Sequence, residues 1–91
     1  MQNSRFENNL WKFRKIANLK QKDLAYLLGI KNISQISRWE KGERLPSLEN
    51  CFKLSIVFGC SVEEIFSDLY EKTKNFIEKR KKQKDTENQE K

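Results

Sequence analysis

An all-α fold of about five helices is what the 91-residue sequence predicts. Apolar residues recur at intervals of three and four residues along most of the chain, which is the spacing of one face of an α-helix. The three glycines and the single proline, Pro46, all fall between these periodic segments, where breakers of helices belong. With 36% hydrophobic residues, the chain can bury one compact core but not two.

The first four helices each have a recognisable end. A first amphipathic helix is expected from Arg5 to Ala17, followed by Asn18, which tolerates the left-handed conformation after a helix. Three shorter helices are then expected, each stopped by a glycine. Their apolar residues cover positions 24–28 before Gly29, 33–39 before Gly42 and 48–58 before Gly59.

A fifth helix is expected to open at Ser61, because Ser61 and Glu64 have the Ser-x-x-Glu spacing of a capping box. An apolar stripe continues from Val62 to Ile77, so this helix should reach about Lys81. The last residues contain no apolar side chain and are expected to be disordered. The predicted organisation is a folded domain over 1–66, a helical extension over 67–82 and a polar tail over 83–91.

The net charge of +6 is concentrated in one segment. Residues 12–44 contain nine basic and three acidic residues, whereas residues 45–77 contain three basic and five acidic residues. This segregation favours a surface that faces a polyanion, although a solvated lysine-rich face would have the same composition. No stretch has the roughly 18 apolar residues of a membrane span, and the first residues lack the apolar core of a signal peptide, so we expect a cytoplasmic protein with no membrane partner.

Residue types that usually perform catalysis or bind metals are scarce. The chain has no histidine, and Cys51 and Cys60 occupy apolar positions of a helical pattern without metal-ligand spacing. Each glycine is needed at a helix end, which leaves none for a phosphate-binding loop. We therefore expect reduced core cysteines, no bound metal or cofactor and no enzymatic activity.

The segment from Gln21 to Glu40 has the pattern of two short helices joined by a turn. Ala25 is small where the two helices would cross, Gly29 supplies the positive φ of the turn, and Ile36 would pack inward to fix the second helix. Two helices held in this way can present one of them to the major groove of DNA.

Four motifs follow one another in this chain. They are Gln21-x-Asp23-Leu24-Ala25-x-x-Leu28-Gly29, Ile36-Ser37-Arg38-Trp39-Glu40-x-Gly42, Pro46-Ser47-Leu48-Glu49 and Phe58-Gly59-Cys60-Ser61-Val62-Glu63-Glu64-Ile65-Phe66. Together they resemble the phage lambda repressor and Cro type of helix-turn-helix protein, the XRE family. The resemblance covers residues 6–66, and three departures from the pattern are Lys20 at the usual helix-cap position, Lys31 as an additional residue in the turn, and Ile33 where a polar residue is common.

The resemblance implies a lambda-repressor-like domain whose recognition helix, at about residues 33–41, lies in the major groove. The residues that would face the bases are Ile33, Ser34, Gln35, Ser37 and Arg38. The residues that would hold phosphates are Lys20, Gln21, Lys22, Asn32, Lys41 and Arg44. Arg14 and Glu40 match a pair that forms a salt bridge between the first and third helices in this family.

Two of these positions have a structural alternative. Ile33 lies one turn from Ile36, so its side chain could join the core instead of contacting a thymine methyl group. Trp39 is expected to be a core residue. The basic run at 79–82 suits either solubility or non-specific contact with DNA.

The function implied is sequence-specific binding of double-stranded DNA by a transcriptional repressor, expected to act as a homodimer. The alternative is an antitoxin of a toxin-antitoxin pair, which would bind a protein partner as well as its own promoter; exposed Trp11 and Ile56 would favour it. The apolar stripe beyond Phe66 would be buried either between two copies or by folding back over Trp11 and Ile56.

Overall fold

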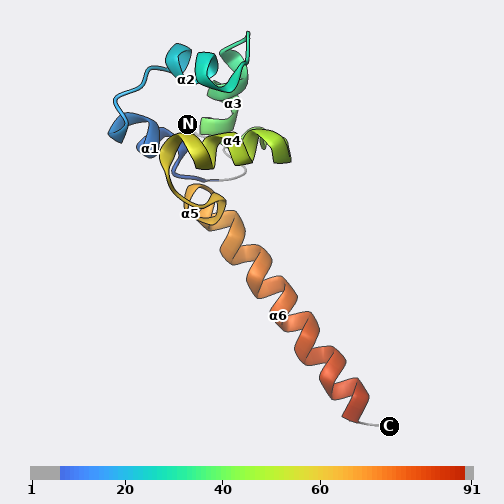
Figure 1. The fold of residues 1–91 in the computed structure, drawn as a ribbon. Coiled ribbons are helices and arrows are strands. Elements are labelled where there is room, and N and C mark those ends of the chain that lie inside the picture. The colour runs from blue at the N-terminus through green and yellow to red at the C-terminus, as the bar shows by residue number, and fades with distance from the viewer. Residues whose placement is uncertain (1–6, 90–91) are drawn as a thin grey trace.

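The computed structural model describes residues 7–89 of the chain, and the side chains of residues 7–85. Helices are the only regular elements in this part, which confirms the all-α prediction. In Figure 1 the shorter helices gather into one domain, and the long α6 projects from it. The helices are α1 (Leu10–Ile16), α2 (Gln21–Leu28), α3 (Ser34–Lys41), α4 (Leu48–Phe58), α5 (Val62–Ile65) and α6 (Ser67–Gln89).

The core of the domain lies where the first five helices meet. Its centre is formed by aliphatic side chains that have no exposed surface, together with Trp39 and Phe66, which are almost fully buried. Phe13 of α1 stacks on Phe58 of α4, with ring centroids 6.0 Å apart. Fully burying one aliphatic side chain contributes about 1.5–3 kcal/mol to the stability of the fold. The fully buried residues are Leu10, Leu24, Leu28, Ile36, Leu54 and Ile65.

Residue types at the helix ends match the backbone geometry there. Asn18 follows α1 with φ 60°, and Gly29 follows α2 with φ 74°, both in the left-handed region. This conformation is open to glycine and tolerated by asparagine, so the chain can turn sharply after each helix. Helix α1 begins later than predicted: residues 7–9 are not helical, and the expected start at Arg5 lies outside the described residues.

The predicted single fifth helix is two helices, because the chain breaks at Phe66, where φ is −113° and ψ is 52°. Asn9 accounts for the break. Its backbone N–H donates to the Ile65 carbonyl at 2.8 Å, and its side-chain Nδ2 donates to the Glu64 carbonyl at 2.9 Å. Those two carbonyls would otherwise accept bonds from the next turn of a continuous helix. The chain therefore leaves α5 after Ile65 and restarts as α6 at Ser67.

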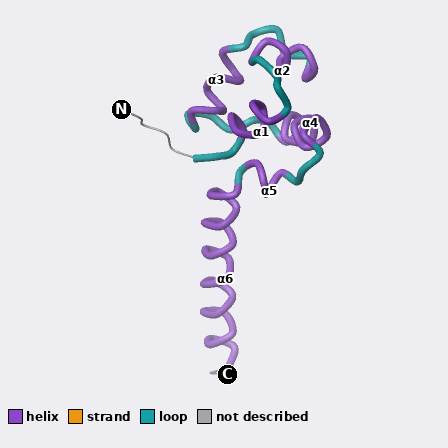
Figure 2. Tube along the Cα trace, turned by 90° about the vertical axis from the view of Figure 1, so that its left-hand side faces the viewer, coloured by secondary structure: helices purple, strands orange, loops and turns teal. Residues whose placement is uncertain are grey.

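Helix α6 runs beyond the end predicted for it. It continues to Gln89, so residues 83–89, expected to belong to a disordered tail, are helical, and residues 90 and 91 lie outside the described part. The two views in Figures 1 and 2 agree that α6 points away from the other helices. It therefore does not fold back over Trp11 and Ile56, which are 54% and 80% exposed.

Candidate nucleic-acid interface

Helix α3 has a buried side and an open side. Ile36 and Trp39 are buried, and they lie three residues apart, so one face of the helix is anchored in the core. Gln35 and Arg38 repeat the same spacing on the exposed face. The helix-turn-helix predicted from the sequence therefore leaves a polar, cationic face of α3 open to an external ligand.

The turn between α2 and α3 is arranged by Asn32. Its Oδ1 accepts a hydrogen bond from the backbone N–H of Ser34 at 2.9 Å, which satisfies one free donor at the start of α3. Ile33 precedes the first helical residue and its side chain is 44% exposed. Of the two alternatives for Ile33, the structure favours the open surface over the core.

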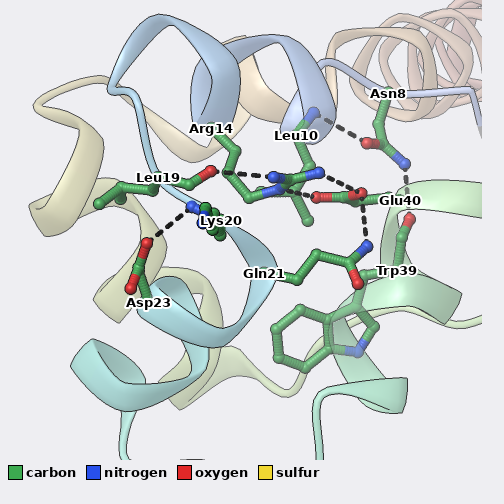
Figure 3. A network of polar contacts seen from close by, with 9 residues as sticks. All are labelled: Asn8, Leu10, Arg14, Leu19, Lys20, Gln21, Asp23, Trp39 and Glu40. Carbon is green, nitrogen blue, oxygen red and sulfur yellow. Dashed lines mark hydrogen bonds and ion pairs between the residues drawn. The ribbon is translucent and has the colours of Figure 1, made fainter.

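A buried ion pair fixes α3 to α1. Arg14 Nε lies 2.5 Å from Glu40 Oε2, and Arg14 Nη2 lies 3.1 Å from Glu40 Oε1 (Figure 3), so the pair expected between the first and third helices is present. Both side chains are almost completely buried. A bidentate contact between guanidinium and carboxylate fixes orientation as well as distance. The recognition helix is therefore held at a defined angle to the domain.

Two further bonds complete this network. Arg14 Nη1 donates to the Leu19 carbonyl at 2.9 Å, and Gln21 Nε2 donates to Glu40 Oε1 at 3.1 Å (Figure 3). No buried side-chain nitrogen or oxygen in the described residues lacks a hydrogen-bond partner. Because every donor and acceptor is paired, the buried charges do not carry the penalty of an unsatisfied polar group.

Asn8 ties the end of α3 to the start of α1, and nothing in the sequence pattern pointed to it. Its Nδ2 donates to the Trp39 carbonyl at 2.9 Å, while its Oδ1 accepts from the backbone N–H of Leu10 at the same distance (Figure 3). A residue outside any helix thus bridges two of them. A second independent link therefore holds the recognition helix in place.

The start of α2 is capped by Asp23 rather than by the residue before the helix. The Asp23 carboxylate accepts a hydrogen bond from the backbone N–H of Lys20 at 2.9 Å, which is one of the two bonds of a capping box. Lys20 itself and Lys22 are exposed. A lysine can therefore occupy the cap position and remain available to an anion.

The residues expected to hold phosphates divide into two groups. Lys41 at the last position of α3 and Arg44 just after that helix are exposed, as Lys20 and Lys22 are at the start of α2. Gln21 is half-buried and its side-chain amide donates one hydrogen to Glu40, so the other amide hydrogen and the backbone N–H at the start of α2 could face a phosphate oxygen. Phosphate contact by these residues stays a prediction.

A groove of about 370 Å³ lies between α3, the segment that follows it and the start of α4. It brings Gln35 and Arg38, expected to face bases, together with Arg44, expected to face phosphates. It also includes two polar residues that were not predicted from the sequence, Ser47 and Asn50, and one apolar residue, Leu45. The Ser47 hydroxyl accepts from the backbone N–H of Asn50 at 3.2 Å and so begins α4 beside the groove. The lining residues are Gln35, Arg38, Trp39, Arg44, Leu45, Ser47 and Asn50.

Residues 7–89 show no feature of a metal site, a nucleophilic thiol or a membrane span. Histidine, cysteine and carboxylate side chains form no cluster able to hold a metal ion there. Cys51 and Cys60 are free and half-buried, and burial raises the pKa of both thiols. Neither thiol is therefore poised as a nucleophile at neutral pH. No helix in this part is long and apolar enough to cross a membrane.

Comparisons with known proteins agree with this geometry. A family model described as helix-turn-helix matches residues 12–65. A relative in Methanocaldococcus jannaschii, an uncharacterised HTH-type transcriptional regulator, is 42% identical over 60 residues, which are 66% of this chain and 89% of that protein. The crystal structure of the restriction-modification controller protein C.AhdI from Aeromonas hydrophila is similar with a TM-score of 0.57 and 33% identity, over 64% of this chain and 86% of that one.

Fold, site and matches together define a DNA-binding helix-turn-helix protein. The chain belongs to the helix-turn-helix family, in its XRE-type branch, and acts in the regulation of transcription. The matched region ends at residue 65, immediately before the break at Phe66, so α6 is an addition to the shared fold.

Proposed function

We propose that the protein is a sequence-specific repressor that reads the major groove of double-stranded DNA with α3. The observation that carries this proposal is the division of α3 into an anchored face and an open face. Ile36 and Trp39 hold the helix from behind, while Gln35 and Arg38 stand exposed in front. A helix fixed from behind can enter a groove with its side chains already oriented.

Arg38 is the residue proposed to provide the main base contact. A guanidinium can donate two parallel hydrogen bonds to O6 and N7 of guanine, which no other base pair presents in the same pattern. Ile33, at the exposed start of α3, suits the methyl group of thymine. The remaining residues proposed to face bases are Ser34, Gln35 and Ser37.

Phosphate contacts would come from both sides of the recognition helix. Exposed basic residues stand at the start of α2 and at the end of α3, so we propose that they hold the sugar-phosphate backbone while α3 enters the groove. These contacts add affinity that depends on salt but not on sequence. The proposed phosphate set is Lys20, Gln21, Lys22, Asn32, Lys41 and Arg44.

Repression requires only that the bound protein occupies a promoter, which a small DNA-binding domain can do by itself. A single α3 covers few base pairs, so two copies on adjacent half-sites would supply the affinity and specificity of a regulator. We therefore propose that the protein binds DNA as a homodimer. We also propose that it acts in the cytoplasm.

One observation favours the second candidate, an antitoxin that also binds a protein partner. Leu48, Phe52 and Ile56 repeat every four residues along α4 and are each more than half exposed. An amphipathic helix normally turns its apolar residues inward, so such a stripe suits a protein surface. An antitoxin should be less stable alone than with its partner, whereas a repressor should melt cooperatively and reversibly as the purified protein.

The base-reading role of Arg38 has a direct test. Arg38→Ala should cost about 1–3 kcal/mol of specific binding and relax the preference at one base position. Lys12→Ala, at an exposed position on α1 outside the proposed DNA contacts, removes the same unit of charge and serves as the matched control. Fluorescence anisotropy on a specific and a scrambled duplex at fixed salt measures both variants. Equal specific affinity for Arg38→Ala and wild type would rule the role out.

A further inference from the structure

An apolar groove of about 230 Å³ lies open where α5 meets α6. Apolar cavities of about 150 Å³ hold a benzene ring, so this space is sufficient for an aromatic side chain. One acidic residue, Glu63, stands at its edge. The apolar walls come from Val62, Phe66, Leu69 and Tyr70, with Thr73 at the end.

The next two turns of α6 continue the same face without any cover. Phe76 is 61% exposed and Ile77 is 44% exposed. Phe76 follows Leu69 by seven residues and Thr73 by three, which places it on the face that lines the groove. The guanidinium of Arg80 lies over the Phe76 ring, 6.0 Å from its centroid, one turn further along. The α6 face thus has an empty groove at one end and exposed apolar side chains near its middle.

Charge is segregated along the same segment. Residues 63–71 contain four acidic and no basic residues, whereas residues 79–84 contain five basic and no acidic residues. Two copies of α6 side by side in parallel would place like charges together. An antiparallel arrangement places each acidic end against a basic end, and complementary charge of this kind selects register and orientation.

We propose that two copies of this chain associate through antiparallel α6 helices, with Phe76 and Ile77 of each copy seated in the α5–α6 groove of the other. The proposal rests on the homodimer put forward above and specifies its surface. When Phe66 of one copy lies opposite Phe76 of the second, the two-fold axis falls between Leu69 and Thr73. Both contacts then occur twice, as an isologous interface requires.

Glu63 belongs to α5 and lines the same groove, while the Arg80 guanidinium lies over the Phe76 ring. A Phe76 ring seated in the groove of the second copy therefore brings Arg80 within reach of an ion pair with Glu63 of that copy. Each dimer then contains two such ion pairs flanking the aromatic contacts. The Arg80 guanidinium lies over the Phe76 ring, so it would approach the groove of the other copy together with that ring.

Sedimentation equilibrium of the full chain without DNA tests the apolar half of the proposal. Phe76→Ser should raise the dimer dissociation constant at least about tenfold, since truncated aromatic anchors at interface centres cost more than 1 kcal/mol. Ile56→Ser removes a more exposed apolar side chain from the α4 stripe and should leave the constant within about twofold. A monomeric wild type at high concentration overturns the proposal, as does a dimer that Ile56→Ser disrupts and Phe76→Ser does not.

Charge reversal tests the orientation. Glu63→Arg and Arg80→Glu should each raise the dissociation constant by about three- to tenfold, and the double variant should restore it. In a parallel dimer neither single reversal would have this effect, because each position would face itself. Unchanged single variants, or a double variant weaker than both, overturn the antiparallel arrangement.

DNA binding is measured separately, so the two proposals fail in different ways. Arg38→Ala should remain a dimer in sedimentation while it loses specific DNA binding. Phe76→Ser should keep half-site binding while it loses dimerisation. A wild-type protein that shows no sequence-specific DNA binding would refute the proposed function. The sedimentation experiment would still decide whether α6 forms the dimer.

Discussion

The five-helix domain and α6 are both helical but are stabilised differently. In the domain, apolar side chains such as Leu24 and Ile36 are completely buried, and the charges of Arg14 and Glu40 are paired inside the fold. In α6, the apolar side chains beyond Leu69 are exposed. The domain therefore has tertiary contacts of its own, whereas α6 beyond its first turns relies on local helical bonds.

The two regions differ in what stabilises their helices. Helical stability in proteins comes mostly from packing of an amphipathic face rather than from residue propensity. The domain satisfies that requirement within one chain. Helix α6 has apolar side chains on one face, but no other part of the described chain buries them. A second molecule that binds this face would therefore also stabilise the helix. The DNA-reading function and the proposed assembly function are thus carried by separate parts of the molecule.

Glu40→Ala breaks the domain side of this comparison and should have the largest effect. The substitution leaves the Arg14 guanidinium buried without its carboxylate and also removes the acceptor of Gln21. Deleting one member of a buried pair costs about 3–5 kcal/mol. Chemical denaturation followed by circular dichroism measures the free energy of unfolding.

Glu49→Ala is the matched control for this prediction. Glu49 pairs with Lys53 across one turn of α4 at 3.6 Å, but it is 80% exposed, so the pair should contribute less than about 1 kcal/mol. Similar losses for the two variants would show that the Arg14–Glu40 pair is no more important than a surface contact.

The sequence predicts the domain well because its signals are local. Helical spacing, the glycines and the Ser61–Glu64 capping box identify the helices and their ends, and the box is present, with Ser61 N–H donating to Glu64 Oε1 at 2.8 Å. The match to family motifs places α3 and its anchors, Ile36 and Trp39. These features depend on residues close together in the chain.

Features that depend on distant residues could not be read from the sequence. The break at Phe66 is caused by Asn9, more than fifty positions earlier, and the second tie of α3 is made by Asn8. No periodicity marks an isolated asparagine whose partner is a backbone carbonyl. The disordered tail was expected because residues 83–91 lack apolar side chains, yet i to i−4 bonds extend α6 through a polar sequence to Gln89.

Ser61→Ala tests the junction between the two regions and should have an intermediate effect. The hydroxyl accepts from the backbone N–H of Glu64 at 3.1 Å and begins α5. Loss of an N-cap side chain costs about 1 kcal/mol. Ser61→Asp keeps the acceptor, so its melting temperature should stay near that of wild type. If both variants lowered the melting temperature equally, the hydrogen bond of the Ser61 side chain would not be the cause of the lost stability.

Truncation after Thr73 should have the smallest effect on the domain. It keeps Leu69, which packs against the core, and removes Phe76 and Ile77, which do not. The free energy of unfolding measured at low protein concentration, where wild type is monomeric, should change by less than about 1 kcal/mol, as for exposed positions generally. Unfolding of the truncated domain would show that α6 is part of its core.

Selection of bound sites from a random pool of double-stranded DNA tests the central claim most directly. The full-length protein should enrich an inverted repeat whose half-site centres lie about one helical turn, roughly 34–36 Å, apart, with a guanine in each half-site whose preference Arg38→Ala removes. A pool with no enriched sequence, or an enriched site that Arg38→Ala selects equally well, would contradict the account of α3 as the helix that reads DNA.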